Sequence, residues 1–160
     1  SHPGRVSRQV VGVSDPSMAP RVAGVLAARG REHALVVHGA DRLDELTTTD
    51  VTRIYEVRDG DLVADYELDP TELGISRVNR EQLIGGGPEE NARIAHAIFG
   101  GEETGPRADI VALNAAAGLV VAGVVTDLAD GVEAARAAIA DGRAAEKLAA
   151  VAQRSNELAS

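Results

Sequence analysis

Two adjacent carboxylates, Asp44 and Glu45, follow an apolar stretch of the chain at a short distance. The stretch, residues 34–37, ends in His38-Gly39 and has the composition of a buried strand. Ligands of open α/β sheets bind just beyond the carboxyl ends of the strands. Carboxylate oxygens at such a place suit Mg²⁺, a hard cation that commonly links protein carboxylates to phosphates. The pair therefore predicts a magnesium site for transfer at a phosphorylated sugar, whereas an acidic pair that only faces solvent is the simpler alternative.

The four histidines do not form a catalytic group with other residues. His38 closes the apolar stretch beside the acidic loop, and we interpret it as a structural hydrogen-bonding residue rather than a proton carrier. His33 and His96 fit exposed helix or loop positions, and His2 lies at the end of the chain. No Ser-His-Asp arrangement and no paired-histidine metal spacing is visible. We therefore predict no catalytic or cofactor-binding residue, and only the acidic pair as metal ligands.

A glycine run, residues 85–87, precedes Pro88 and invites comparison with a phosphate loop. Glycines before a helix can offer backbone amides to an anion. However, Glu89 and Glu90 fill the first helical turn and would repel phosphate, and the Lys and hydroxyl of a full phosphate loop are missing. We interpret the run as a tight turn. Asn114, a polar exception in an apolar segment, is interpreted as a buried amide that bonds to the backbone.

The composition limits the classes of protein to consider. With 160 residues, the chain is long enough for one core, so residues 1–160 are expected to form a single domain. The net charge of −9 and the 2% aromatic content argue against nucleic acid or an acidic membrane surface as a partner. The lack of cysteine excludes disulfides and thiolate metal sites. Because no apolar run could cross a bilayer and no signal peptide is visible, we expect a cytoplasmic protein.

The first part of the chain has the pattern of a strand-helix-strand unit. Residues 9–14 and 34–38 are predicted to be strands, and their order around one helix makes them parallel. The helix is predicted over residues 15–29, with Asp15 as its N-cap and Pro16 at the first helical position. This arrangement predicts the α/β class, with a sheet covered on both faces.

The pattern then changes to a hairpin followed by helices. Residues 49–57 and 62–68 are predicted to be antiparallel strands around Asp59-Gly60. One face of the second strand is expected to carry Leu62, Ala64, Tyr66 and Leu68. The predicted helices cover residues 88–99, 108–123, 126–140 with Thr126 as N-cap, and 141–156 with Asp141 as N-cap.

Several segments, taken in order, share motifs with one enzyme family. They are Gln9-Val10-Val11-Gly12-Val13, Val37-His38-Gly39 with Leu43-Asp44-Glu45, Tyr66-Glu67-Leu68-Asp69-Pro70 with Leu73-Gly74, Leu83-Ile84-Gly85-Gly86-Gly87-Pro88-Glu89-Glu90-Asn91-Ala92, Asp109-Ile110-Val111-Ala112-Leu113-Asn114-Ala115-Ala116, and residues 131–144. In this order and spacing the chain resembles the C-terminal half of the anthranilate phosphoribosyltransferases, tryptophan-pathway enzymes of the nucleoside-phosphorylase-like class. Within the resemblance, the segment with Asp44 and Glu45 matches the family's metal motif.

The resemblance implies both a fold and an activity. The implied fold is a nucleoside phosphorylase/phosphoribosyltransferase catalytic domain, with parallel strands, an antiparallel hairpin extension and C-terminal helices. The implied activity is transfer of the phosphoribosyl group from phosphoribosyl pyrophosphate to anthranilate. Mg²⁺ held by Asp44 and Glu45 would offset the charge of the departing pyrophosphate. The family is homodimeric through its N-terminal helices, so an oligomer of this chain would use another surface.

The N-terminal half of the family has no counterpart in this chain. Members are about twice as long, and that half contains a helical domain, the glycine-rich pyrophosphate loop, and Asn and Arg side chains that hold anthranilate. The resemblance therefore implies a fragment, or one piece of a split enzyme with a companion N-terminal chain, that is inactive alone. A related phosphorylase or phosphoribosyltransferase with another acceptor stays open, as does a non-catalytic structural or interaction domain.

Overall fold

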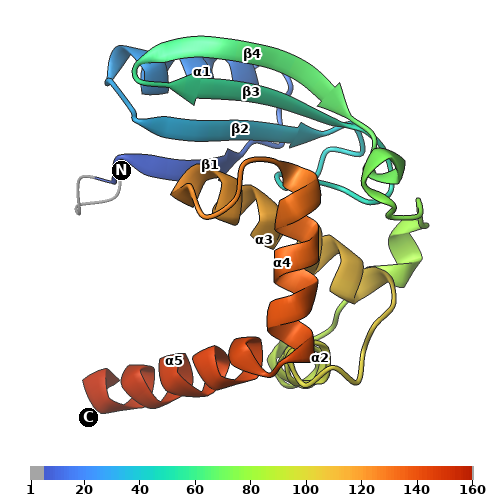
Figure 1. The fold of residues 1–160 in the computed structure, drawn as a ribbon. Helices are drawn as coiled ribbons and strands as arrows, with labels where there is room; N and C mark the ends of the chain where they lie inside the picture. The colour runs from blue at the N-terminus through green and yellow to red at the C-terminus, as the bar shows by residue number, and fades with distance from the viewer. Residues whose placement is uncertain (1–5, 160) are drawn as a thin grey trace.

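The computed structural model describes residues 6–159, which form a four-stranded mixed sheet with helices on both faces (Figure 1). The strands are β1 (Arg8–Gly12), β2 (His33–Gly39), β3 (Thr52–Arg58) and β4 (Asp61–Leu68), and they lie side by side in that order. β1 and β2 are parallel, whereas β2, β3 and β4 pair antiparallel. The predicted α/β class, with a parallel pair and a hairpin extension, is confirmed.

The helices surround this sheet unequally. They are α1 (Ala19–Ala28), α2 (Pro88–Phe99), α3 (Pro106–Ala122), α4 (Leu128–Ala140) and α5 (Arg143–Ala159), with short 3₁₀ turns η1 (Pro70–Leu73) and η2 (Arg80–Gln82). α1 lies on one face, α3 packs against the other, and α4 packs on α3 with its start near the sheet (Figure 1). α5 lies apart from the sheet and starts beside α2 and the end of α4, and its residues 151–159 are all exposed (Figure 1). No helix within residues 6–159 is long and apolar enough to cross a membrane.

Strand β2 is buried along its whole length, as its run of Ala, Leu and Val predicts. Alternate residues point to opposite faces of a strand. Ala34 and Val36 therefore join a cluster with α1, while Leu35 and Val37 join the larger cluster formed with α3 and α4. Two separate apolar cores thus enclose one strand, and its carboxyl end is held firmly in place.

Two predicted helix starts were wrong because side-chain hydrogen bonds moved them. The carboxylate of Asp15 accepts a hydrogen bond from Ser17 N at 2.9 Å, so it closes a turn, and α1 begins only at Ala19. Asp127, not Thr126, caps α4, because its Oδ1 accepts from Asp130 N at 2.9 Å. In both cases the short acidic side chain satisfies a nearby backbone amide.

The hairpin between β3 and β4 forms as predicted. Asp59 and Gly60 both have positive φ, at 49° and 88°, which is the backbone that a two-residue loop of this kind requires. The expected single face of β4 is wrong in one position. A bulge between the pairs Glu56↔Ala64 and Val57↔Leu62 puts Leu62 on the face opposite to Ala64, and Leu62 is 50% exposed.

The expectation that His33 is exposed was also wrong. His33 is the first residue of β2 and only 4% exposed. Its Nε2 lies 2.9 Å from Glu56 Oε1 on the neighbouring strand β3. A half-buried carboxylate therefore provides the polar partner that a buried imidazole needs. His96, in contrast, lies exposed on α2 as expected.

α3 and α4 cross at a point where only glycine fits. A Cβ at Gly131 of α4 would lie 2.7 Å from the Cβ and 2.9 Å from the Cα of Ala116 in α3. We expect Gly131→Ala to lower the free energy of unfolding by about 1–3 kcal/mol, because overpacking forces the helices apart. Gly24→Ala is the matched control, because nothing lies within 4 Å of its added Cβ in α1.

Gly24→Ala should leave stability unchanged or raise it by up to about 1 kcal/mol, since alanine favours a helix interior. Urea unfolding of both variants, followed by circular dichroism, checks the opposite signs. Equal effects of the two substitutions would contradict the close crossing of α3 and α4.

Candidate metal-binding loop

The predicted acidic pair lies in the loop of residues 40–51, which joins the carboxyl end of β2 to β3. Asp44 and Glu45 are both exposed. Within residues 6–159 neither carboxylate takes part in a hydrogen bond or ion pair. The structure therefore places both side chains at the strand end where they were expected, with their oxygens free to bind a cation.

The loop around this pair is held by a third acid, Asp41, that the sequence analysis did not single out. Asp41 Oδ2 accepts hydrogen bonds from the hydroxyls of Thr47 at 2.9 Å and Thr49 at 2.6 Å. Its Oδ1 accepts from Leu43 N at 3.2 Å. Thr47 and the neighbouring Thr48 are fully buried. Asp41 thus ties the start of the loop to its end, while the acidic pair lies between them.

The same contacts set the charge of Asp41. Burial by itself would raise the pKa of this carboxyl group, because it disfavours the ionised form. The hydrogen bonds from Thr49, Leu43 N and Thr47 outweigh burial, so the pKa lies below its ordinary value of 3.8. Asp41 is therefore a structural carboxylate that stays ionised, and its oxygens are already used by the loop.

Two glycines allow the loop to come close to the strands. A Cβ at Gly12, the last residue of β1, would lie 1.5 Å from the Asp44 carbonyl oxygen. A Cβ at Gly39, the last residue of β2, would lie 2.4 Å from Asp41 Oδ1. The backbone of Asp44 is thus in direct contact with the end of β1, and the side chain of Asp41 with the end of β2, which is possible only without side chains at these two glycines.

Asn114 of α3 holds the other side of the acidic pair. Its Oδ1 accepts from Leu46 N at 2.9 Å, and its Nδ2 donates to Leu46 O at 2.8 Å and to Ile110 O at 3.0 Å. The interpretation of Asn114 as an amide bonded to the backbone is confirmed. The sequence did not indicate that the bonded backbone belongs to the residue directly after Glu45.

His38 has the structural role that was predicted for it. Its ring is 8% exposed, and Nδ1 donates a hydrogen bond to the carbonyl oxygen of Val13 at 2.7 Å. Val13 N in turn donates to Val37 O at 2.9 Å. His38 therefore fastens the chain after β1 to the end of β2.

The glycine run of residues 85–87 is an irregular segment with a bend at Gly87 before α2, and not the tight turn that was predicted. Asn91 holds this segment, since its Oδ1 accepts from Gly86 N at 2.9 Å and its Nδ2 donates to Gly86 O at 3.0 Å. Glu89 and Glu90 fill the first turn of α2. The backbone amides that an anion would need therefore lie beside two acidic residues. One of these amides, Gly86 N, already donates a hydrogen bond to Asn91.

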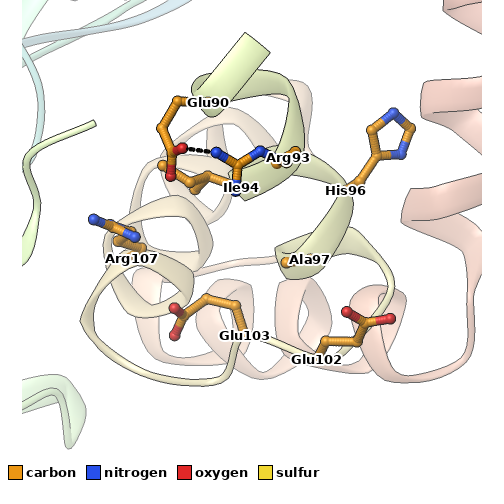
Figure 2. Close-up of a pocket in the computed structure, with 8 residues that line it drawn as sticks. All are labelled: Glu90, Arg93, Ile94, His96, Ala97, Glu102, Glu103 and Arg107. Carbon is orange, nitrogen blue, oxygen red and sulfur yellow. Dashed lines mark hydrogen bonds and ion pairs between the residues drawn. The ribbon is translucent and has the colours of Figure 1, made fainter. Parts of the chain in front are cut away.

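A pocket of about 430 Å³ lies beside α2 and the start of α3, away from the acidic pair (Figure 2). Figure 2 shows Glu90 and Arg93 pointing toward each other as an ion pair. Arg107 donates to the carbonyl oxygen of Ile84 at 2.6 Å, and Glu103 accepts from Gly105 N at 2.7 Å. Glu90, Arg93, Glu103 and Arg107 thus already make bonds within the chain, and the pocket lies away from the acidic pair, so it is not a better candidate for the site.

The acidic pair fits Mg²⁺ by the chemistry of its donors. Within residues 6–159 no group of three or more His, Cys, Asp or Glu side chains could hold a metal alone. Mg²⁺, however, is usually bound by only one or two carboxylates together with water and substrate phosphates. The carboxylates of Asp44 and Glu45, on a loop held by hydrogen bonds, match the number of protein ligands that such a site requires.

The hydrogen bonds of Asp41 predict an acid-dependent contribution to stability. Because its pKa is lowered in the folded chain, the contribution is complete above the ordinary value of 3.8 and is lost as the pH falls through the lower folded value. We expect Asp41→Asn to cost about 1–3 kcal/mol at neutral pH, since three donors lose a charged acceptor. The difference from wild type should shrink in acid.

Urea unfolding at pH 7 and in increasing acid measures this difference. Asp44→Asn is the matched control, because the Asp44 carboxylate makes no hydrogen bond within residues 6–159 and should change stability little. A cost of Asp41→Asn that stays constant with pH would show that the charge of Asp41 does not hold the loop.

Comparison with known proteins identifies the family of the chain. Residues 1–145 match the glycosyl transferase family, a/b domain. The anthranilate phosphoribosyltransferase of Acetivibrio thermocellus is 43% identical over 148 residues, which are 92% of this chain and 42% of that protein. The enzyme of the same name from Thermomicrobium roseum is 46% identical over 161 residues, covering 99% of this chain and 46% of the relative. The chain thus spans less than half the length of these relatives.

Solved structures show the same fold. The anthranilate phosphoribosyltransferase of Thermus thermophilus superposes with a TM-score of 0.75 at 43% identity, covering 83% of this chain and 38% of that one. The Saccharomyces cerevisiae enzyme in complex with PRPP and Mg has a TM-score of 0.78 at 23% identity, covering 88% and 41%. With a family match over almost the whole sequence and relatives above two-fifths identity, this chain belongs to the glycosyl transferase family and carries its a/b domain.

Proposed function

We propose that the chain is the metal-holding α/β part of an anthranilate phosphoribosyltransferase, and that residues 1–160 act as a single domain. The observation that supports this proposal is the acidic pair: within residues 6–159 the exposed carboxylates of Asp44 and Glu45 make no hydrogen bond or ion pair, while Asp41 and Asn114 hold the loop around them. Relatives that are 43–46% identical bear the name of this enzyme, which supports the activity. The proposed substrates are phosphoribosyl pyrophosphate and anthranilate.

The proposed ligands of Mg²⁺ are the carboxylates of Asp44 and Glu45. Bound there, Mg²⁺ would neutralise negative charge on the pyrophosphate of the donor. The loop contributes by keeping the two carboxylates at one place, so they need little reorganisation when the donor binds. Asp41 is unsuited to the same role, because its oxygens already accept three hydrogen bonds from the loop.

The reaction we propose needs no nucleophile from this chain. The bond from the ribose C1 to pyrophosphate breaks as the amine of anthranilate forms a new bond to C1. His38 is the ionisable ring nearest the loop in sequence, but it is bonded to Val13 O and 8% exposed, so it is held for structure rather than for proton transfer. The contribution of this chain is thus electrostatic and positional.

The remaining contacts to both substrates are proposed to come from a further part of the protein. This chain spans 42–46% of the relatives' length. A basic cradle for pyrophosphate and an anthranilate site would lie in that further part, either in a companion chain or in the same longer protein. The 160-residue chain alone should therefore supply a half-site without turnover.

Calorimetric titration with Mg²⁺ tests the half-site directly. In the presence of phosphoribosyl pyrophosphate, we expect heat of binding for the wild-type chain and its loss in the Asp44→Asn/Glu45→Gln variant, because the neutral amides are poor Mg²⁺ ligands. Glu89→Gln/Glu90→Gln is the matched control, an adjacent acidic pair at the start of α2. Equal heat in wild type and the Asp44/Glu45 variant would place the metal elsewhere.

A second measurement tests the need for the further part. The purified chain, incubated with phosphoribosyl pyrophosphate, anthranilate and Mg²⁺, should form no phosphoribosyl anthranilate detectable by mass spectrometry. The reason is that a single electrostatic half-site leaves both substrates without fixed positions relative to each other. Product formation that depends on Asp44 and Glu45 would overturn this expectation and show that the chain is sufficient.

A further inference from the structure

We infer that Asn114 is a positioning residue for the loop of residues 40–51. Through Asn114, helix α3 sets the direction of the Asp44 and Glu45 carboxylates. The inference rests on the proposed metal role of that pair. Asn114 is 68 residues away from Leu46 in sequence, yet both backbone groups of Leu46 bond to its amide. No other side chain within residues 6–159 bonds to the backbone of residues 44–46.

The geometry of the contact is that of a complete amide pair. Leu46 N donates to Asn114 Oδ1 at 2.9 Å, and Asn114 Nδ2 donates to Leu46 O at 2.8 Å. The peptide group that carries Leu46 N is the one that follows Glu45. Two parallel bonds fix the rotation of this backbone segment, where a single bond would leave it free to turn.

Asn114 is itself held rigidly. Its Nδ2 also donates to Ile110 O one helical turn earlier, at 3.0 Å, so both amide hydrogens have acceptors. The adjacent Leu113 and the following Ala116 and Ala117 of α3 are fully buried in the larger core. The bonds from Asn114 therefore connect the loop to the packed core and not to another flexible segment.

A second anchor acts on the other side of the acidic pair. The Asp44 carbonyl oxygen lies against Gly12 at the end of β1, where a Cβ would come within 1.5 Å. Leu46 itself is completely buried. The backbone of the acidic pair is thus fixed at both ends. Asp44 contacts Gly12 of β1, and Leu46, directly after Glu45, makes two hydrogen bonds to Asn114 of α3. This leaves the carboxylates exposed while their backbone is fixed.

This arrangement predicts that Asn114 affects metal binding without touching the metal. Residues that orient metal ligands typically cost about 10- to 100-fold in metal affinity when they are changed. We therefore expect Asn114→Ala to weaken Mg²⁺ binding, measured by calorimetry with phosphoribosyl pyrophosphate present, by at least about tenfold. The substitution removes all three hydrogen bonds of the amide but neither carboxylate.

Asn91→Ala is the matched control. The side-chain amide of Asn91 also makes a pair of hydrogen bonds to the backbone of one residue, Gly86. This contact lies at the start of α2, away from the acidic pair. A merely structural role of Asn114 would lower unfolding free energy in both variants and leave metal affinity unchanged. The positioning role predicts weaker Mg²⁺ binding for Asn114→Ala only, with faster hydrogen exchange at the Leu46 amide.

Asn114→Asp provides a second variant in case the alanine variant does not fold. It keeps the acceptor for Leu46 N and the shape of the side chain, but its other oxygen faces the carbonyl oxygens of Leu46 and Ile110. We expect it to weaken Mg²⁺ binding as well. If a folded Asn114 variant binds Mg²⁺ with the affinity of the wild type, the positioning role is wrong, but the proposed metal site is not contradicted. No binding by wild type overturns the proposed metal site and this inference together.

Discussion

The complete burial of strand β2 is the constraint on which the rest of the structure depends. A strand with apolar side chains on both faces needs cover on both sides, and α1 provides it on one side while α3 and α4 provide it on the other. Because alternate residues of β2 enter different cores, neither cover can shift without exposing apolar surface. The carboxyl end of β2, and the loop that leaves it, are therefore placed by two cores at once.

The loop of residues 40–51 starts at this fixed strand end and carries the proposed metal ligands, Asp44 and Glu45. Asp41 accepts hydrogen bonds from the hydroxyls of Thr47 and Thr49, Asn114 bonds to the loop backbone, and the loop packs closely against Gly12 and Gly39. The carboxylates of Asp44 and Glu45 are exposed and make no hydrogen bond or ion pair within residues 6–159. Three acids in a five-residue segment thus have opposite roles. The bonded one stabilises the loop, and the free pair is available to a cation and a phosphate.

The chain covers less than half of the relatives' length, which is consistent with the proposal that it supplies only part of a magnesium site. The chain spans 42–46% of its relatives and carries the two proposed metal ligands on a firm scaffold, but no group of three or more possible ligands within residues 6–159. Magnesium sites of phosphate-transfer enzymes are completed by substrate oxygens. Such an arrangement makes metal binding depend on the donor, because the protein ligands alone leave most of the coordination shell to water.

The sequence by itself determined the elements whose signals are local. Periodicity and turn residues predicted strand β2, the parallel β1–β2 pair, the Asp59-Gly60 hairpin, and helices α2 and α3, which each end at a glycine. The acidic pair was found from its place after a strand. Only the tertiary structure decided which polar groups meet. The burial of His33 beside Glu56 and the opposite face of Leu62 depended on strand pairing and a bulge. The starts of α1 and α4, in contrast, were set by local hydrogen bonds that the sequence pattern did not distinguish from neighbouring caps. The bond between Asn114 and Leu46 joins residues that no local pattern connects, because the packing of α3 against the sheet brings them together.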